Sequence, residues 1–112
     1  MAVQSASEDL AHPRREEIQL TQVLFALSDP ARLAIVCQLM DGPLEMARCH
    51  LYDPSVPKST KSHLMKVLRE SGVIRNEPLG RGRVLTLRRA DLDARFPGLL
   101  DAILAEARQL AG

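Results

Sequence analysis

Aromatic residues and cysteines are scarce in this chain. It has no tryptophan, one tyrosine, two phenylalanines and two cysteines among 112 residues. A core with so few rings must be built from Leu, Ile, Val and Ala, which suits a helical protein better than a β-sandwich. Two cysteines without a framework spacing fit a reducing, cytoplasmic setting. No stretch approaches 18 uninterrupted apolar residues and no basic start precedes an apolar run, so we expect a cytoplasmic protein without a membrane partner.

Motifs that mark common enzyme classes are also missing. There is no Gly-rich phosphate loop, no nucleophile elbow and no His-Glu-x-x-His pattern. The adjacent carboxylates Glu16 and Glu17 fall on different faces of a predicted helix, so they do not form an acid–base pair. We therefore predict that the chain is not an enzyme and has no cofactor.

Length and composition indicate one ordinary globular domain. The chain is 46% hydrophobic and 26% charged, which argues against wholesale disorder. Residues 1–13 are small and polar and end in His12-Pro13, so we expect a flexible tail there. The folded domain is predicted to span residues 14–112.

Positive charge is concentrated in one segment of a nearly neutral chain. Nine Lys or Arg residues and only two acidic residues, Glu70 and Glu77, lie between Pro57 and Arg89. This segment carries +7 and the rest of the chain −6, giving the net +1. A basic patch of this kind is typical of nucleic-acid-binding proteins.

The order of predicted elements is helix, helix, short helix, helix, hairpin, helix. The first four helices are expected over 14–27, over 30–40 after a cap at Ser28 or Asp29, over 44–51, and over 57–71 ending at Gly72. The strands are expected over 73–79 and 83–87 around Gly80-Arg81-Gly82, and a last helix follows Asp91-Leu92-Asp93 and runs through Pro97 to Leu110. This order predicts a mainly α fold with a small β-hairpin (α+β), a winged helix-turn-helix. The first and last helices are more apolar than one small core needs, so we expect them to form a homodimer interface.

Two stretches carry a family resemblance. Leu24–Ile35, read as LFALSDPARLAI, and Ser59–Ile74, read as STKSHLMKVLRESGVI, occur in the order found in the ArsR/SmtB winged-helix repressors. The resemblance covers roughly residues 20–90. It implies a homodimeric repressor that leaves its operator when a metal, a thiol-reactive agent or a small molecule binds.

The chain departs from this family at its metal sites. Glu45 and Ala47 stand where the family has a Cys-x-Cys pair, and the last predicted helix contains no histidine. Because zinc-like metals favour thiolate and imidazole, neither site carries over. Leu64 also replaces a histidine that is common in the family, with His63 beside it.

The predicted reading helix and hairpin supply the candidate DNA contacts. Donors on the first two turns of the helix can reach base edges or phosphates, two further cations suit the backbone, and arginines at the hairpin suit the minor groove. These residues are Lys58, Ser59, Thr60, Lys61, Ser62 and His63, then Lys66 and Arg69, then Arg81 and Arg83. Thr60 is also expected to face inward. A merely solvated basic surface is the plain alternative.

Two cysteines are candidates for redox sensing. Cys37 falls on the apolar stripe of the second helix, where a small hydrophobic residue would serve equally well. Cys49 follows Arg48, which favours a thiolate, and is the better candidate. The spacing neither predicts nor excludes a Cys37–Cys49 disulfide. A metal site from Cys49, His50, Asp53 and His12 would be a poor chelate, because neighbouring helical residues point apart.

Three alternatives to an effector-released repressor stay open at this point. One is a winged-helix module that docks an acidic protein partner through the same basic face. Another is a metal-responsive repressor with an atypical site. The last is a DNA-binding protein that senses nothing.

Overall fold

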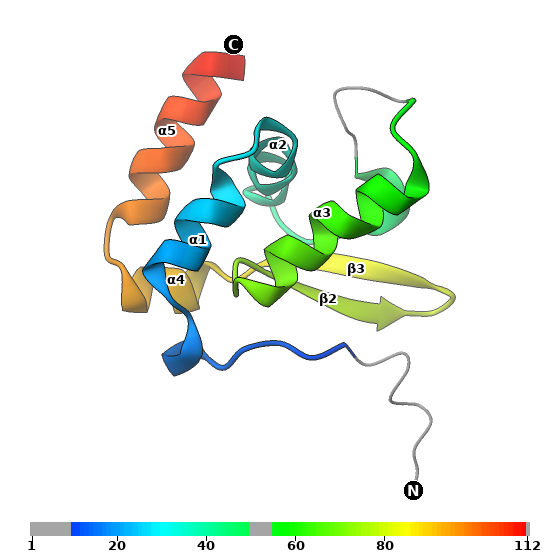
Figure 1. Cartoon of the computed structure of the whole chain (residues 1–112), viewed down its shortest axis with the longest axis horizontal. Helices are drawn as coiled ribbons and strands as arrows, with labels where there is room; N and C mark the ends of the chain where they lie inside the picture. Colours follow the sequence, from blue (N-terminus) through cyan, green and yellow to red (C-terminus); the bar gives the residue numbers. More distant parts are fainter. Residues whose placement is uncertain (1–9, 50–54, 112) are drawn as a thin grey trace, which may run out of the picture.

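The fold was obtained as a computed structural model, which describes residues 10–49 and 55–111 and the side chains up to residue 109. The elements along the chain are η2 (Arg15–Glu17), α1 (Leu20–Leu27), α2 (Pro30–Leu39), β1 (Leu44–Glu45), η3 (Met46–Arg48), α3 (Lys58–Glu70), β2 (Ile74–Leu79), β3 (Gly82–Leu87), α4 (Arg89–Arg95) and α5 (Leu99–Ala111) (Figure 1). Five helices and a small sheet confirm the predicted α+β class.

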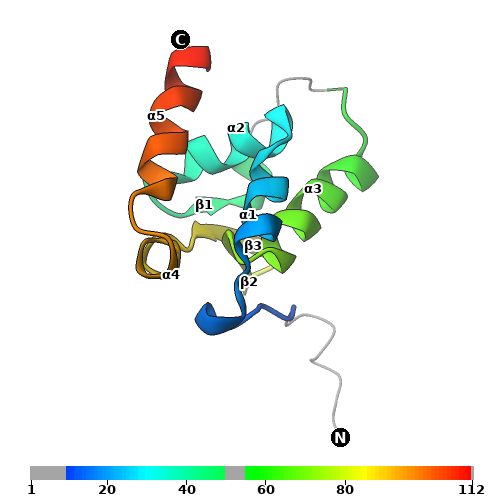
Figure 2. The same cartoon turned by 60° about the vertical axis from the view of Figure 1, so that its left-hand side comes forward.

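The sheet is antiparallel, with strand order β1-β3-β2. α1, α2 and α3 lie over it, and α5 stands beside α2 (Figures 1 and 2). Fully buried side chains from the helices and the sheet form one core, including Ile35, Leu68, Ile74 and Leu85. The aliphatic core expected from the composition is therefore present.

The junction between α1 and α2 follows its local sequence. Asp29 caps α2 by accepting a hydrogen bond from the Arg32 backbone at 3.0 Å, and Pro30 occupies the first helical position. The buried Arg32 guanidinium donates to the carbonyl oxygens of Ala26 and Phe25. Together with the bonds that Ser28 donates to the Phe25 carbonyl, they satisfy carbonyl groups at the end of α1 and so hold the bend between the two helices.

Membrane-crossing length is not reached by any single helix in the ranges described. α1 and α2 taken together have the length and composition, but they meet at a bend of 100°.

The short helix predicted over residues 44–51 is wrong. Leu44 and Glu45 instead pair with Leu85 and Val84 as strand β1, and only the 3-10 turn η3 follows. A strand of two residues carries no periodicity, and its partners lie some forty residues later. His50 and Leu51 lie outside the described residues.

The first and last predicted helices are both interrupted. In the first, Ile18 and Gln19 are extended, so α1 begins only at Leu20. In the last, the chain breaks between α4 and α5 at Pro97-Gly98, where Gly98 has φ +81°. The first break lies at Ile18, which is buried in the core, and at the second the positive φ of Gly98 lets the chain turn between α4 and α5.

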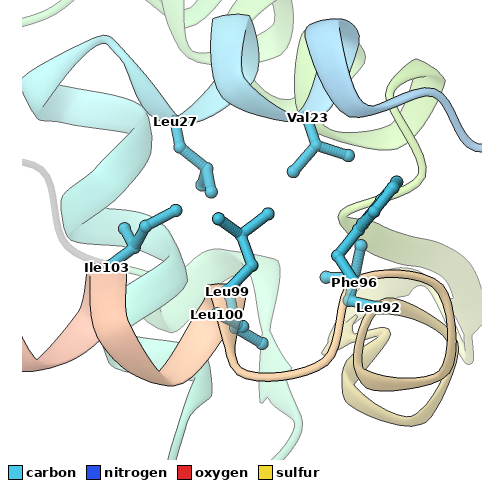
Figure 3. A pocket seen from close by; sticks show the side chains of 7 residues that line it. All are labelled: Val23, Leu27, Leu92, Phe96, Leu99, Leu100 and Ile103. Atoms are coloured by element: carbon cyan, nitrogen blue, oxygen red, sulfur yellow. The ribbon is translucent and has the colours of Figure 1, made fainter.

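An apolar seam joins α1 to α4 and α5 within the chain. Val23 and Leu27 of α1 line this seam from one side, and Leu92 of α4, Phe96 just after it, and Leu99, Leu100 and Ile103 of α5 line it from the other (Figure 3). Leu100, Leu104 and Ala107 are buried, whereas Phe96, Leu99 and Ile103 are half-buried. Much of the apolar band on α5 is thus used inside one chain. The side chain of Leu110 lies outside the described residues.

Candidate nucleic-acid interface

α3 is the predicted reading helix, and it presents a polar face beyond the core. Leu64, Met65 and Leu68 are buried on its inner side. Six residues of its first nine are exposed: Lys58, Ser59, Thr60, Ser62, His63 and Lys66. The expectation that Thr60 faces inward is wrong, because core contact begins only at Leu64, one turn later. Since Leu64 is buried, its side chain does not face outward in place of the family histidine, whereas His63 beside it does.

Lys61 differs from its neighbours on α3. It is half-buried, and its Nζ donates to the carbonyl oxygen of Met46 at 3.2 Å. The ammonium therefore ties the first turns of α3 to η3. The side-chain ammonium groups of Lys58 and Lys66, in contrast, have no hydrogen bond or ion pair to another residue in the described ranges.

The hairpin forms the predicted wing. Leu79 pairs with Gly82, so the turn is Gly80-Arg81, one residue shorter than expected, and Gly80 has the φ of +59° that such a turn requires. Arg81 is exposed at the tip. The turn lies on the same side of the molecule as the N-terminal end of α3 (Figure 1).

Two of the candidate arginines are held by the protein itself. Arg83 is half-buried and donates to the side-chain and main-chain oxygens of Asn76 on β2. Arg69 donates to the carbonyl oxygen of Ala11 in the N-terminal segment. Both contacts draw the guanidinium groups toward the protein rather than outward.

Part of the positive segment is neutralised by acidic residues of α4 and α5. Arg15, Arg88 and Arg75 surround Asp91, with N–O distances of 2.7, 2.9 and 3.7 Å. The hydrogen bond from Arg15 lowers the pKa of Asp91, opposed by burial and reinforced by Arg88. Arg89 pairs with Asp93 and Asp101. Among the cations of this segment that the structure describes, Lys58 and Lys66 on α3 and Arg81 at the wing tip have no such partner.

Both cysteines are free thiols. Cys49 is only 5% exposed, and burial raises its pKa, with Lys61 opposing that shift. Cys37 is half-buried, and burial raises its pKa as well, opposed by Arg108. A raised pKa keeps a thiol protonated and less nucleophilic at neutral pH. The thiolate expected from Arg48 next to Cys49 thus meets a stronger opposing effect of burial.

A metal centre finds no support among the residues that the structure describes. No three His, Cys, Asp or Glu side chains there lie close enough to share an ion. His12 is instead engaged at β2, where its Nε2 accepts a hydrogen bond from the Asn76 backbone. His50 and Asp53 of the candidate set lie outside the described residues.

The sequence is similar to that of a known transcriptional regulator. No protein-family model matches the chain. It is 32% identical to the HTH-type transcriptional regulator NmtR of Mycobacterium tuberculosis over 93 residues, which are 82% of this chain and 72% of that protein.

Solved structures agree with this likeness. An ArsR family transcriptional regulator, RHA00566, superposes with a TM-score of 0.60 at 27% identity, over 81% of this chain and 93% of that one. The transcriptional repressor BigR from Xylella fastidiosa gives a TM-score of 0.54 at 26% identity, over 69% and 85% of the two chains. A possible transcriptional regulator for arsenical resistance gives 0.58 at 26% identity, over 83% and 95%. Together with the exposed cationic helix and wing, these likenesses show that the chain belongs to the ArsR/SmtB family of winged helix-turn-helix transcriptional regulators, which bind DNA and are not enzymes.

Proposed function

We propose that this protein is a cytoplasmic, homodimeric repressor that binds an inverted-repeat operator and leaves it when an effector binds. The observation that carries the proposal is that two cationic features share one side of the molecule. The N-terminal end of α3, whose first turns are exposed, lies on the same side as the hairpin turn (Figure 1), and the exposed Arg81 belongs to that turn. A helix in the major groove with an arginine in the adjacent minor groove requires this arrangement.

Exposed apolar residues on α1 support a second copy as partner. Leu20 and Leu24 are each 43% exposed and lie one helical turn apart on the same face. A two-fold axis through this face would bury them and place two copies of α3 side by side. Paired reading helices of this kind match two half-sites of a palindrome.

The candidate DNA-binding residues divide into three groups under this proposal. Lys58, Ser59, Thr60, Ser62 and His63 on α3, with Arg81 on the wing, meet the DNA directly. Lys66 contacts the phosphate backbone of the DNA. Lys61, Arg69 and Arg83 act mainly by holding α3 and the wing in place, because their donors are engaged within the protein.

Operator binding is the test of this proposal. The full chain is offered random duplexes, selected sequences are titrated by fluorescence anisotropy, and salt is varied. We expect a palindromic consensus and a steep fall of log affinity with log salt concentration.

The double variant Lys58→Glu/Arg81→Glu should lose operator binding while its helicity is unchanged. Arg14→Glu is the matched control, since Arg14 is exposed and its ion pairs with Glu16 and Glu17 are exposed too. Retention of affinity by the double variant, or competition by an acidic protein but not by duplex, would refute the proposal.

The effector is tested with the same assay. Cys49 and Cys37 are the candidate thiols if the effector is an oxidant or electrophile. Oxidant, divalent metals and small molecules are added in turn to the protein–operator complex. Release by oxidant that persists in Cys49→Ser excludes Cys49 as the trigger, and persistence in Cys37→Ser excludes Cys37. Failure of every addition would leave a regulator controlled by its abundance, contrary to the proposal.

A further inference from the structure

The segment before η2 is attached to the body of the protein by three hydrogen bonds. Arg69 on α3 donates to the carbonyl oxygen of Ala11, and the Arg88 Nη1 donates to that of Pro13 at 2.6 Å. Between them, the Nε2 of His12 accepts from the Asn76 backbone at 3.0 Å. The segment thus runs along β2 (Figure 1). The predicted flexible tail ends in this attached stretch, and residues 1–9 of it lie outside the described residues.

His12 covers a backbone donor that would otherwise lack a partner. β2 is an edge strand of the sheet, and Asn76, at its centre, is only 4% exposed. An outward-facing amide at a buried position of an edge strand needs an acceptor, because an unpaired buried donor is costly. The imidazole supplies that acceptor only while Nε2 carries no proton.

Asn76 also connects this contact to the wing. Its side-chain and main-chain oxygens accept from Arg83, which lies two residues after Arg81 at the wing tip. The hydrogen bond from Asn76 to His12 and those from Arg83 to Asn76 meet at one residue of β2. They therefore join the N-terminal segment, β2 and β3.

We propose that His12 is a positioning residue for the wing. Its neutral imidazole holds the N-terminal segment against β2, and its protonation releases this hold and weakens DNA binding. The effect on DNA binding rests on the function proposed above, whereas the hold on β2 does not.

The charges around His12 determine the direction of the pH effect. Arg75 on β2, Arg69 on α3 and Arg88 before α4 face it, against the single carboxylate of Glu77. Burial first, and then these arginines, lower the pKa of His12, while Glu77 opposes the shift. A lowered histidine pKa means that attachment is strongest above the ordinary value of about 6.5 and is lost as the pH falls through the lowered one.

The first test follows the attachment without DNA. The amide signal of Asn76 in the full chain should shift with the same midpoint as the His12 imidazole, below pH 6.5 or so. Amide protection at Asn76 should fall roughly three- to tenfold in His12→Ala at pH 7.5. His12→Gln retains an acceptor that does not titrate, so its Asn76 signal should be insensitive to pH over this range. An Asn76 signal that ignores the titration of His12 would overturn the proposal.

The second test measures operator affinity between pH 7.5 and 5.5. His63 is a second imidazole, exposed on α3 among the proposed DNA contacts, so the protein with His12 and the His12→Gln variant both carry His63→Gln. In that background we expect affinity to fall roughly three- to tenfold on acidification with His12 present, and to stay level in His12→Gln. Equal pH profiles would overturn the role of His12. If no duplex is bound at any pH, the proposed function fails instead. The Asn76 amide signal then still shows whether His12 holds the N-terminal segment against β2.

Discussion

Lys61 and Met46 are joined by a hydrogen bond of 3.2 Å from the lysine Nζ to the methionine carbonyl oxygen. This bond connects α3 to η3, two elements that follow each other in a helix-turn-helix. Lys61 therefore has a structural role, whereas the side chain of the exposed Lys58 on the same helix does not make such a bond.

The two lysines should respond differently to truncation. Lys61→Ala removes a partly buried hydrogen bond and should lower the free energy of unfolding by about 1 kcal/mol, as well as weakening operator binding. Lys58→Ala should weaken binding with a change in unfolding free energy within about 0.5 kcal/mol. Urea unfolding and anisotropy on the same samples check both expectations. Equal stability of the two variants would show that the Lys61 contact contributes nothing.

Gly72 occupies a position that other residues cannot share. Its φ is +88°, and a Cβ placed there would lie 2.5 Å from Cγ1 of the buried Ile18. Gly72→Ala should therefore lower the unfolding free energy by about 2–4 kcal/mol, from backbone strain and overpacking together. Gly42→Ala is the matched control, because Gly42 has a positive φ but no atom within 4 Å of its would-be Cβ. A similar loss in both variants would mean that Ile18 moves aside without cost.

Asp91 should contribute to stability in a pH-dependent way. Its pKa is lowered in the folded protein, so its contribution is complete above the ordinary aspartate pKa and is lost as the pH falls below that value through the lowered one. Asp91→Asn also deprives Arg88, whose side chain is 2% exposed, of its carboxylate. We expect a loss of about 1–3 kcal/mol at pH 7 that shrinks below pH 4 or so.

Urea unfolding at pH 7 and pH 3 measures this difference. Asp101→Asn is the control, because its pair with Arg89 is exposed and should contribute little. A loss in Asp91→Asn that is independent of pH would indicate that packing, rather than charge, explains it.

Leu24 tests the proposed dimer. A charge on the exposed apolar face of α1 cannot be buried against a second copy without a partner, so Leu24→Glu should shift the protein to a monomer and weaken operator binding. Analytical ultracentrifugation gives the mass of each species. Phe25→Gln is the control, since Phe25 lies over Arg32 and beside Val67 of α3, away from that face. A dimeric Leu24→Glu would place the interface elsewhere.

Local signals predicted some elements accurately. Asp29 and Pro30 mark the start of α2, Gly72 marks the end of α3, and the glycines around Arg81 mark the wing turn. In each case the helix cap, the helix end or the hairpin turn depends on residues that are close together in the sequence. The exposed lysines and serines of α3 were predicted for the same reason, from helical period alone.

Contacts between distant parts of the chain were not predictable in this way. β1 forms because Leu44 meets Leu85, and His12 becomes an acceptor because Asn76 lies beside it. Nothing near Lys61, Arg69 or Arg83 in the sequence indicates that their donors are engaged within the protein. Cationic residues look alike in a sequence, whether they face DNA or a backbone carbonyl.

The sequence by itself determined the fold class, the family and the concentration of positive charge in one segment. Helical period, caps and charge are properties of neighbouring residues, and they survive without any tertiary contact. Only the tertiary structure decided which cations are free and which are engaged, and how the N-terminal segment meets the wing. The reason is physical, because the burial of a side chain and its hydrogen-bond partner depend on which parts of the chain fold against it. These parts can be far away in the sequence, so neighbouring residues do not indicate them.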